Sequence, residues 1–279
     1  MSAPEVMSVA GASLAIFRDA PSLDGSQTAA LGAFACDTAR AGATLIREAM
    51  ASLKAEGFGA VVGPMDGSTW AKHRLVVESD GRSPFLMEPQ NPAHYVQAFD
   101  QSGLQIVSRY VSAVRPADVP ESGSRSPPGL QLRDFDPARA ESELTRIHAL
   151  SLEAFATNKF YQSISLEDFL ASYRPVLKAI APELVLLAED EAGALKAFLF
   201  AFPNLAEGPQ PKSVILKTYA SQVKGGGSML ANAFHARAQR LGFVDVIHAL
   251  MHEGNLSATH SGNTGGRVFR RYALWGGRL

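Results

Sequence analysis

The sequence lacks several features that would place it in a specialised class of protein. Cys36 is the only cysteine, so no disulfide can form within the chain and nothing indicates an oxidising compartment. The apolar residues at 31–35 predict that this thiol lies unreactive in a buried or edge strand. No apolar run approaches the roughly 18 residues that span a bilayer, and no basic residue precedes the first apolar stretch. A cytoplasmic location without membrane contact is expected.

An excess of positive charge is also lacking. The chain has 26 Lys and Arg against 27 Asp and Glu, for a formal net charge of −1. Such a balance gives no general attraction to a phosphate backbone, so a nucleic-acid partner is not expected. The 279 residues are 46% hydrophobic and 19% charged, which is typical of a globular protein with one large or two ordinary domains.

A stretch rich in Pro, Ser and Gly divides the chain in two. It covers residues 116–129, lacks apolar periodicity, and predicts a linker between domains at residues 1–115 and 130–279. Helical and strand patterns alternate in both halves. In the first half we expect strands at 6–18, 29–36, 59–62 and 104–114, and helices at 43–56 and 93–101, with a long loop after residue 62.

The second half is expected to begin with a strand at residue 130. Asp136 before Pro137 predicts one helix start, and Ser165 in a Ser-Leu-Glu-Asp capping box predicts another. The turn at 190–193 predicts a hairpin. The further expected elements are strands at 183–189, 194–202, 213–219, 244–250 and 268–275, and a helix at 228–240.

Three consecutive glycines follow Lys224 within residues 222–228, between an expected strand and an expected helix. Backbone N–H groups and the helix dipole form an anion site at such a junction, and glycines let the backbone approach a phosphate closely. The segment lacks the Gly-Lys-Ser/Thr ending of a P-loop and the Gly-x-Gly-x-x-Gly dinucleotide pattern. A phosphate-binding turn and a plain flexible turn are the two interpretations, and the flanking elements favour the first.

The spacing of Gln222, Gly225 and Gly227 resembles the Gln/Arg-x-x-Gly-x-Gly/Ala loop with which GCN5-related N-acetyltransferases (GNAT) hold the pyrophosphate of acetyl-CoA. The order of elements over residues 130–279 is similar too. The resemblance implies an α/β (α+β) fold of two GNAT-like units, each a mixed, mostly antiparallel twisted sheet flanked by helices. A bacterial group with a second, partial GNAT unit is similar at residues 63–70, 88–92, Tyr95, 215–218, 248–251 and 269–274.

The resemblance implies an acyl-CoA-dependent N-acyltransferase with acetyl-CoA, or another acyl-CoA, as co-substrate and no metal. One strand would pair with the pantetheine arm and polarise the thioester, the glycine loop would hold the pyrophosphate, and an Asn after the next strand would help hold the pantetheine. The residues concerned are Leu216, Lys217, Thr218, Tyr219, Gln222, Val223, Lys224, Gly225, Gly226, Gly227, Ser228 and Asn255.

The sequence departs from the family pattern at two places. Only Ala220 and Ser221 separate Tyr219 from Gln222, so the loop is shortened. In the first half, residues 37–42 stand where a phosphate loop would be and contain an Asp and one Gly, so this half is expected to bind no CoA.

In the family mechanism an amine attacks the thioester directly, which calls for a proton acceptor and a proton donor. Candidate acceptors are His252 and Glu253 at the end of a strand, and His248 within it, where a core role is favoured. The family often supplies a Tyr as acid about seven residues beyond the Asn, where Gly262 stands. That role is therefore either vacant or filled by Tyr272 or Tyr219.

The acceptor is expected to be an amine on a small molecule or peptide. The loop at residues 63–74 contains Trp70, His73 and Arg74 and could cover the acceptor pocket, or form an ordinary surface loop. Two other functions stay open: a non-catalytic GNAT-fold binding or interaction protein, and a tandem-GNAT aminoacyl transferase. A homodimer also stays open, whichever of these functions applies.

Overall fold

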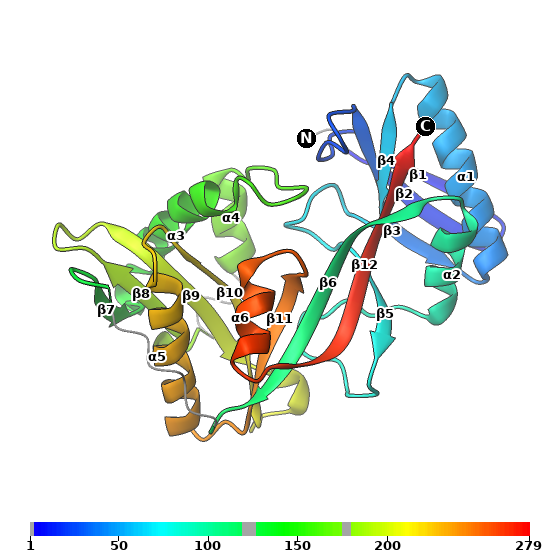
Figure 1. The fold of residues 1–279 in the computed structure, drawn as a ribbon. Helices are drawn as coiled ribbons and strands as arrows, with labels where there is room; N and C mark the ends of the chain where they lie inside the picture. The colour runs from blue at the N-terminus through cyan, green and yellow to red at the C-terminus, as the bar shows by residue number, and fades with distance from the viewer. Residues whose placement is uncertain (1–2, 119–126, 175–179) are drawn as a thin grey trace.

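The computed structural model describes residues 3–118, 127–174 and 180–279. They form one mixed sheet of twelve strands, in the order β1-β2-β3-β4-β12-β6-β11-β10-β9-β8-β7, with β5 pairing to β12 (Figure 1). Two pairs of neighbouring strands are parallel, β3 with β4 and β10 with β11, and the others are antiparallel. Helices flank both halves of the sheet, which confirms the predicted fold class.

The first half contributes six strands to this sheet, and its two helices pack on one face of them. The strands are β1 (Glu5–Val9), β2 (Ala12–Phe17), β3 (Thr28–Cys36), β4 (Ala60–Gly63) and β5 (Leu75–Ser79), with helices α1 (Ala39–Ala55) and α2 (Ala93–Gln101) and the strand β6 (Gln105–Pro116) after them. Leu45 and Leu53 of α1 and Phe99 of α2 pack against Leu31 of β3 and Trp275 of the last strand. Cys36 is a buried free thiol in β3, as predicted.

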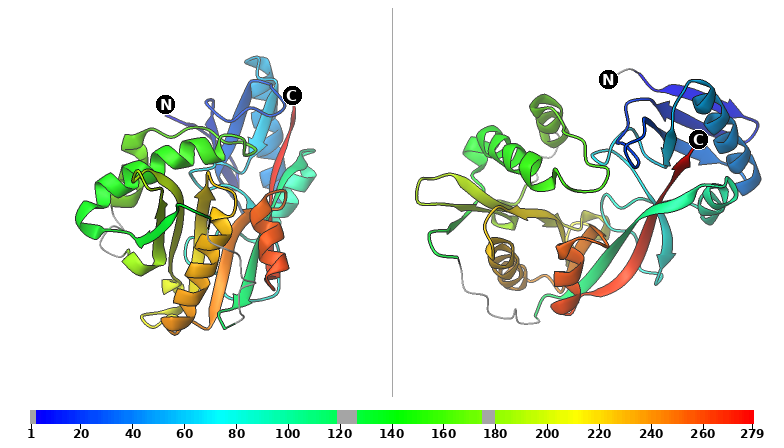
Figure 2. Two further views of the ribbon diagram at one scale, coloured as in Figure 1. Left: turned by 60° about the vertical axis from the view of Figure 1, so that its left-hand side comes forward. Right: turned by 45° about the horizontal axis from the view of Figure 1, so that its top comes forward.

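The second half has helices on both faces of its sheet (Figure 2). Its elements are β7 (Gln131–Asp134), α3 (Ala140–Phe155), α4 (Leu166–Tyr173), β8 (Val185–Glu189), β9 (Leu195–Pro203), β10 (Ser213–Ser221), α5 (Gly226–Arg240), β11 (Asp245–His252), α6 (Leu256–Asn263) and β12 (Arg267–Arg278). Because strand side chains alternate, Leu199 faces Phe234 of α5, whereas Phe198 faces Ile147 of α3 and Phe169 of α4.

The two halves exchange their last strands. The strand β6 leaves the first half and pairs with β11, while β12 leaves the second half and pairs with β4 and β5. The two exchanged strands also pair with each other, and they run side by side between the halves in Figure 1. Each predicted domain therefore completes the sheet of the other. The boundary at 116–129 stays a prediction, since residues 119–126 of it lie outside the described residues.

Most predicted elements are present within a few residues of their expected ends. Asp136 accepts a hydrogen bond from the Ala138 N–H, and the Ser165 hydroxyl accepts one from the Asp168 N–H, so both predicted helix caps are confirmed. Two expectations were wrong. The strand expected at 6–18 is a hairpin that turns at Gly11, with φ of +76°, and the loop expected after residue 62 contains β5.

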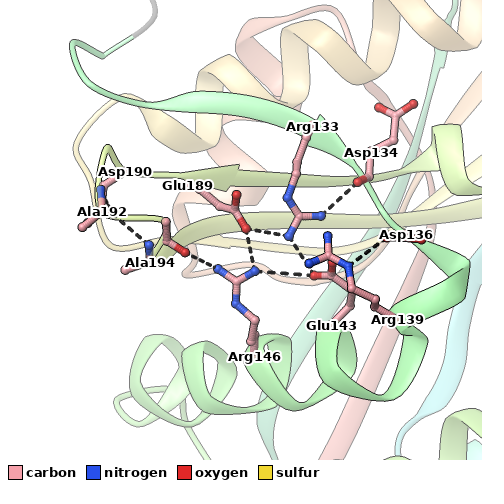
Figure 3. A network of polar contacts seen from close by, with 11 residues as sticks. Arg133, Asp134, Asp136, Arg139, Glu143, Arg146, Glu189, Asp190, Ala192 and Ala194 are labelled. Carbon is pink, nitrogen blue, oxygen red and sulfur yellow. Dashed lines mark hydrogen bonds and ion pairs between the residues drawn. The ribbon is translucent and has the colours of Figure 1, made fainter.

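The outer edge of the second half is held by an ion-pair network (Figure 3). The buried Glu143 carboxylate lies 2.9 Å from Arg133 Nη2, and Arg133 and Arg146 also contact Glu189. These two guanidinium groups lower the pKa of Glu189 to about 2. The network fixes β7 and β8 on α3, on the side of the sheet away from β11.

Within the described residues no helix is long and apolar enough to cross a membrane.

Candidate functional site

The parallel strands β10 and β11 separate halfway along their length. They pair from Ser213 with Asp245 to Leu216 with His248, and no further. A bulge at Lys217 shifts the register of β10 on β9, and a second bulge between His248 and Met251 shifts β11 on β6. Such bulges bend strands apart. The backbone edges beyond Leu216 and His248 therefore face a gap instead of each other.

A cleft with a cavity volume of about 1200 Å³ opens at this separation. Both diverging strands line it, together with the loop and first turns of α5, the helix α6, and two segments from elsewhere in the chain. These segments are residues 69–74 of the first half and residues 154–161 at the end of α3. The cleft thus lies where the two halves meet, and its size is suited to a cofactor-sized ligand together with a second small molecule.

The glycine cluster forms the start of α5 at one side of the cleft. Gly225 caps the helix in the left-handed region with φ of +85°, which favours glycine. A Cβ on Gly226 would overlap the Ser221 hydroxyl. That hydroxyl accepts from the Val223 N–H at 3.1 Å and donates to the Val223 carbonyl at 2.8 Å, so it cannot move without breaking the turn. The N–H groups of a first helical turn have no acceptor within the helix, and they favour an anion here.

The residues expected to bind the cofactor come together at this cleft, with one exception. Leu216, Lys217, Thr218, Tyr219, Gln222, Val223, Lys224, Gly225, Gly227, Ser228 and Asn255 line it. Gly226 is buried behind them, where its missing side chain makes room for Ser221. The Gln222 side chain donates a hydrogen bond to the Glu153 carboxylate of α3 and is therefore already engaged. The shortened loop thus presents backbone groups and Lys224, with Gln222 tied to a neighbouring helix.

His252 lies at the end of β11, where it lines the cleft beside the Tyr110 ring. The pKa of His252 is lowered, mainly by burial and to a smaller extent by repulsion from the charge of Lys159. The imidazole Nδ1 accepts a hydrogen bond from the Gly254 N–H at 3.0 Å. In the neutral ring the proton is therefore on Nε2, and His252 offers an N–H donor to the cleft. It can accept a proton only if the bond to Gly254 is released.

The other two predicted catalytic residues lie outside the cleft. Glu253 points away from it and pairs with Arg271 of β12 at 2.8 Å. Tyr272 is fully buried within the sheet, where its hydroxyl donates to the Glu88 carboxylate and lies 3.0 Å from the Ser112 hydroxyl. A general acid must reach the leaving group. Because the Tyr272 hydroxyl has no such access, the structure argues against that role, and it places Glu253 in a surface ion pair.

His248 belongs to a buried network at the floor of the cleft, in line with the core role favoured from its sequence context. Its Nδ1 lies 2.7 Å from the Ser261 hydroxyl of α6, and its Nε2 lies 3.1 Å from Nε2 of His235 on α5. Burial lowers the pKa of His248 to about 4 and that of His235 to about 2. This network joins the three elements that form the floor.

The end of the loop at 63–74 lines the cleft, and whether it covers an acceptor pocket stays a prediction. Trp70 Nε1 donates to the Gln162 carbonyl at 2.8 Å, and its ring packs edge-on against Tyr161 and Phe169. Asn158, Lys159, Tyr161 and Tyr110 also line the cleft and were not expected from the sequence. Their approach depends on how the halves pack, and no local pattern of residues reports that.

The charged side chains among the described residues that line the cleft are all basic. Among the described residues that line it there is no Asp or Glu, whereas Arg74, Lys159, Lys217 and Lys224 are all present. Burial also lowers the pKa of His73 to about 3, and the charge of Arg74 adds to that effect. The cleft therefore favours anionic groups and disfavours a second cation.

The corresponding place in the first half is closed. The parallel pair β3 and β4 ends at Ala30 with Val62, and the chain after β4 fills the gap that would follow. Met65 donates from its N–H to the Leu31 carbonyl, and the Asp66 carboxylate accepts from the Ala33 N–H at 2.6 Å. These are the backbone groups a pantetheine arm would need. The structure therefore supports the expectation that this half binds no CoA.

No protein-family model matches the sequence, and no curated protein matches it. Solved structures do match the fold. A GCN5-related N-acetyltransferase from Sphaerobacter thermophilus covers 96% of this chain and 76% of its own, with a TM-score of 0.58 at 15% identity. A tandem GNAT protein from the clavulanic acid biosynthesis pathway covers 96% of this chain and 79% of its own, with a TM-score of 0.54 at 14% identity.

A GCN5-related N-acetyltransferase from Anabaena variabilis covers 95% of this chain and 58% of its own, with a TM-score of 0.56 at 9% identity. Each similarity covers at least 95% of this chain and so extends over both halves. Together with the separating parallel strands and the glycine turn, they show that this chain has the fold of the GCN5-related N-acetyltransferases.

Proposed function

We propose that this protein is an acyl-CoA-dependent N-acyltransferase that transfers an acetyl or related group to an amine. The observation that carries the proposal is the joining of two features in one cleft. The backbone edges of β10 and β11 separate there, and the glycine turn at the start of α5 opens onto the same space. One feature suits an extended amide-containing arm, and the other suits a diphosphate.

The residues present fit this co-substrate. Backbone groups of Thr218 and Tyr219 beyond the β10 bulge would hold the pantetheine arm, and Asn255 lies across the cleft from them. The turn at 223–227 would hold the diphosphate, with Lys224 as a mobile cation. Acetyl-CoA supplies an acyl thioester whose carbonyl is open to attack by an amine.

His252 is the side chain proposed for the reacting centre. Its lowered pKa keeps the imidazole neutral at pH 7, and its Nε2–H can donate to an oxygen that gains negative charge during attack. Release of Nδ1 from the Gly254 N–H would let the ring accept the proton that the amine loses. The C–N bond would form as the C–S bond of the thioester breaks, and the CoA thiolate would leave and take a proton from the imidazolium or from solvent. Glu253 has no part in this step because it faces Arg271.

The charge of the cleft would also prepare the nucleophile. An ammonium group placed beside Lys159, with no carboxylate among the described lining residues, is disfavoured relative to the free amine. The lowered pKa of His252 reports the same influence, since Lys159 and Arg74 contribute to it. The acceptor amine would lose its proton to solvent on entry, which reduces the need for a strong base.

Binding of acetyl-CoA is the direct test, by calorimetry and by thermal unfolding. A ligand that binds only the folded state raises the unfolding temperature. At a ligand concentration a hundred times the Kd, the free energy of unfolding increases by about 2.7 kcal/mol. Acetyl-CoA should bind and ATP should not. Absence of binding by acetyl-CoA and by longer acyl-CoAs to the folded protein would overturn the proposal. Binding without CoA release across a broad amine panel would favour the non-catalytic alternative.

A further inference from the structure

Arg74 places a positive charge in the cleft that the protein does not balance. Its Nη1 donates to the Leu250 carbonyl of β11 at 3.2 Å, and its guanidinium lies 4.1 Å from the centre of the Tyr110 ring on β6. Among the described residues no carboxylate pairs with it. Arg270, which is buried in this sheet, contrasts with the partly buried Arg74 because it contacts the Glu88 carboxylate.

The surroundings of Arg74 make this arrangement costly unless something in the cleft offsets it. The Arg74 side chain is partly buried, so it has lost part of its contact with water, and one neutral carbonyl offsets only part of that loss. Burial lowers the pKa of Arg74 to about 10, and the pKa of neighbouring His73 is lowered as well. Both side chains line the cleft. An anionic group of a ligand that enters the cleft can therefore reach Arg74.

The position of Arg74 separates it from the proposed diphosphate site. It contacts β11 and β6, on one arm of the separating strands, whereas the glycine turn follows β10 on the other arm. Its guanidinium lies against the Tyr110 ring, and Trp70 also lines the cleft; both are supplied by the first half or its exchanged strand. An anion at Arg74 would thus belong to the second substrate.

From this geometry we infer that the acceptor is an amine that also carries an oxyanion, a carboxylate or a phosphate, which Arg74 holds. The inference rests on the proposed function for the identity of the second substrate. The planar guanidinium presents several donors at once, which suits the paired oxygens of either group. Trp70 and Tyr110, which also line the cleft, offer aromatic surface to the apolar part of the same molecule.

Calorimetry with simple probes tests the charge recognition without the true acceptor. The probes are phenylacetate, phenyl phosphate and the neutral phenylacetamide, each up to 10 mM, measured with and without CoA. Arg74→Gln removes the positive charge. Arg74→Lys keeps the charge but lacks the paired N–H donors of a guanidinium. Arg47→Gln is the matched control, because Arg47 on α1 also donates to one backbone carbonyl, that of Gln101 at 2.9 Å, and lies outside the cleft.

We expect at least one anionic probe to bind the wild type and Arg47→Gln at least about 10-fold more tightly than phenylacetamide, because hydrogen bonds between a guanidinium and a charged oxygen are stronger than those to a neutral one. Arg74→Gln should lose this preference for an anion, and Arg74→Lys should show a preference between those of the wild type and Arg74→Gln. Whether phenylacetate or phenyl phosphate binds better identifies the oxyanion. If Arg74→Gln does not fold, the comparison between wild type, Arg74→Lys and Arg47→Gln decides.

Equal binding of charged and neutral probes, or no binding of either anion, would overturn the inference. So would a loss of acetyl-CoA affinity in Arg74→Gln as large as the loss for the anions, because Arg74 would then serve the co-substrate. Failure of the proposed function has a separate signature, which is the absence of acetyl-CoA binding to the wild type. The two outcomes are measured with different ligands and cannot be confused.

Discussion

The Nε2 atoms of His235 and His248 lie 3.1 Å apart beneath the cleft, and both rings are buried. Two nitrogen atoms at this distance share one proton, so one ring donates and the other accepts. Neither ring carries a charge at neutral pH, because burial lowers both pKa values far below 6.5. The pair therefore ties α5 to β11 as long as at least one of the two Nε2 atoms carries no proton, and protonation of both rings breaks it.

Acid should weaken the folded state through this pair. Unfolded histidines gain a proton as the pH falls through about 6.5, whereas folded His248 does so near pH 4, so stability is full above pH 6.5 and declines below it. The shift corresponds to roughly 3 kcal/mol for His248. Urea unfolding of wild type and His248→Asn from pH 7.5 to 4.5 should show a flatter dependence in the variant.

Ser261→Ala is the control for this prediction, because it removes the hydrogen bond to His248 Nδ1 and keeps both imidazoles. It should lower stability by about 1 kcal/mol at every pH without flattening the curve. The prediction fails if His248→Asn retains the pH dependence of the wild type.

Gly226→Ala should reduce acetyl-CoA binding at least about tenfold. The new Cβ would overlap Ser221 Oγ and disrupt the turn that holds Val223, which moves the N–H groups at the start of α5. Gly262→Ala is the matched control, since nothing lies within 4 Å of a Cβ there and the residue is helical. Calorimetry should show wild-type affinity for the control. Equal affinities in all three proteins would contradict the assignment of the turn.

His252→Asn and Glu253→Gln should differ sharply in turnover. Removal of an acid–base side chain costs about 100-fold or more in kcat. Glu253 makes a partly exposed ion pair with Arg271, so its neutral variant should keep kcat within about twofold and lose less than about 1 kcal/mol of stability. The measurement is CoA release with the best amine from a panel. A large loss in Glu253→Gln with none in His252→Asn would reverse the assignment.

Trp70 should stabilise the contact between the halves through its ring and its N–H. Trp70→Phe removes the bond to the Gln162 carbonyl and should cost about 1 kcal/mol. Trp70→Ala also removes the packing on Tyr161 and Phe169 and should cost about 2–3 kcal/mol, below the range for a fully buried ring because Trp70 is partly exposed. Urea denaturation of the two variants separates these contributions, and equal losses would show that the ring contributes nothing.

Local chemistry in the sequence determined the elements and one wall of the cleft. Asp136 and Ser165 cap helices with their own side chains, so their positions could be predicted. The glycine turn was predictable for the same reason, because Gly225 needs a left-handed conformation and Gly226 a missing Cβ within a few residues of each other. The strand β5 was missed because its pairing with β12 joins residues far apart in the chain.

The exchange of β6 and β12, and the roles that follow from it, were decided by the tertiary structure alone. Pairing of β12 with β6 buries Tyr272 and turns Glu253 toward Arg271, while the packing of the halves brings Arg74 beside Tyr110 in the cleft. Each contact depends on charge and packing between distant segments, which no local pattern reports. The sequence by itself therefore determined where a diphosphate could be held, and the tertiary structure decided which side chains surround the second substrate.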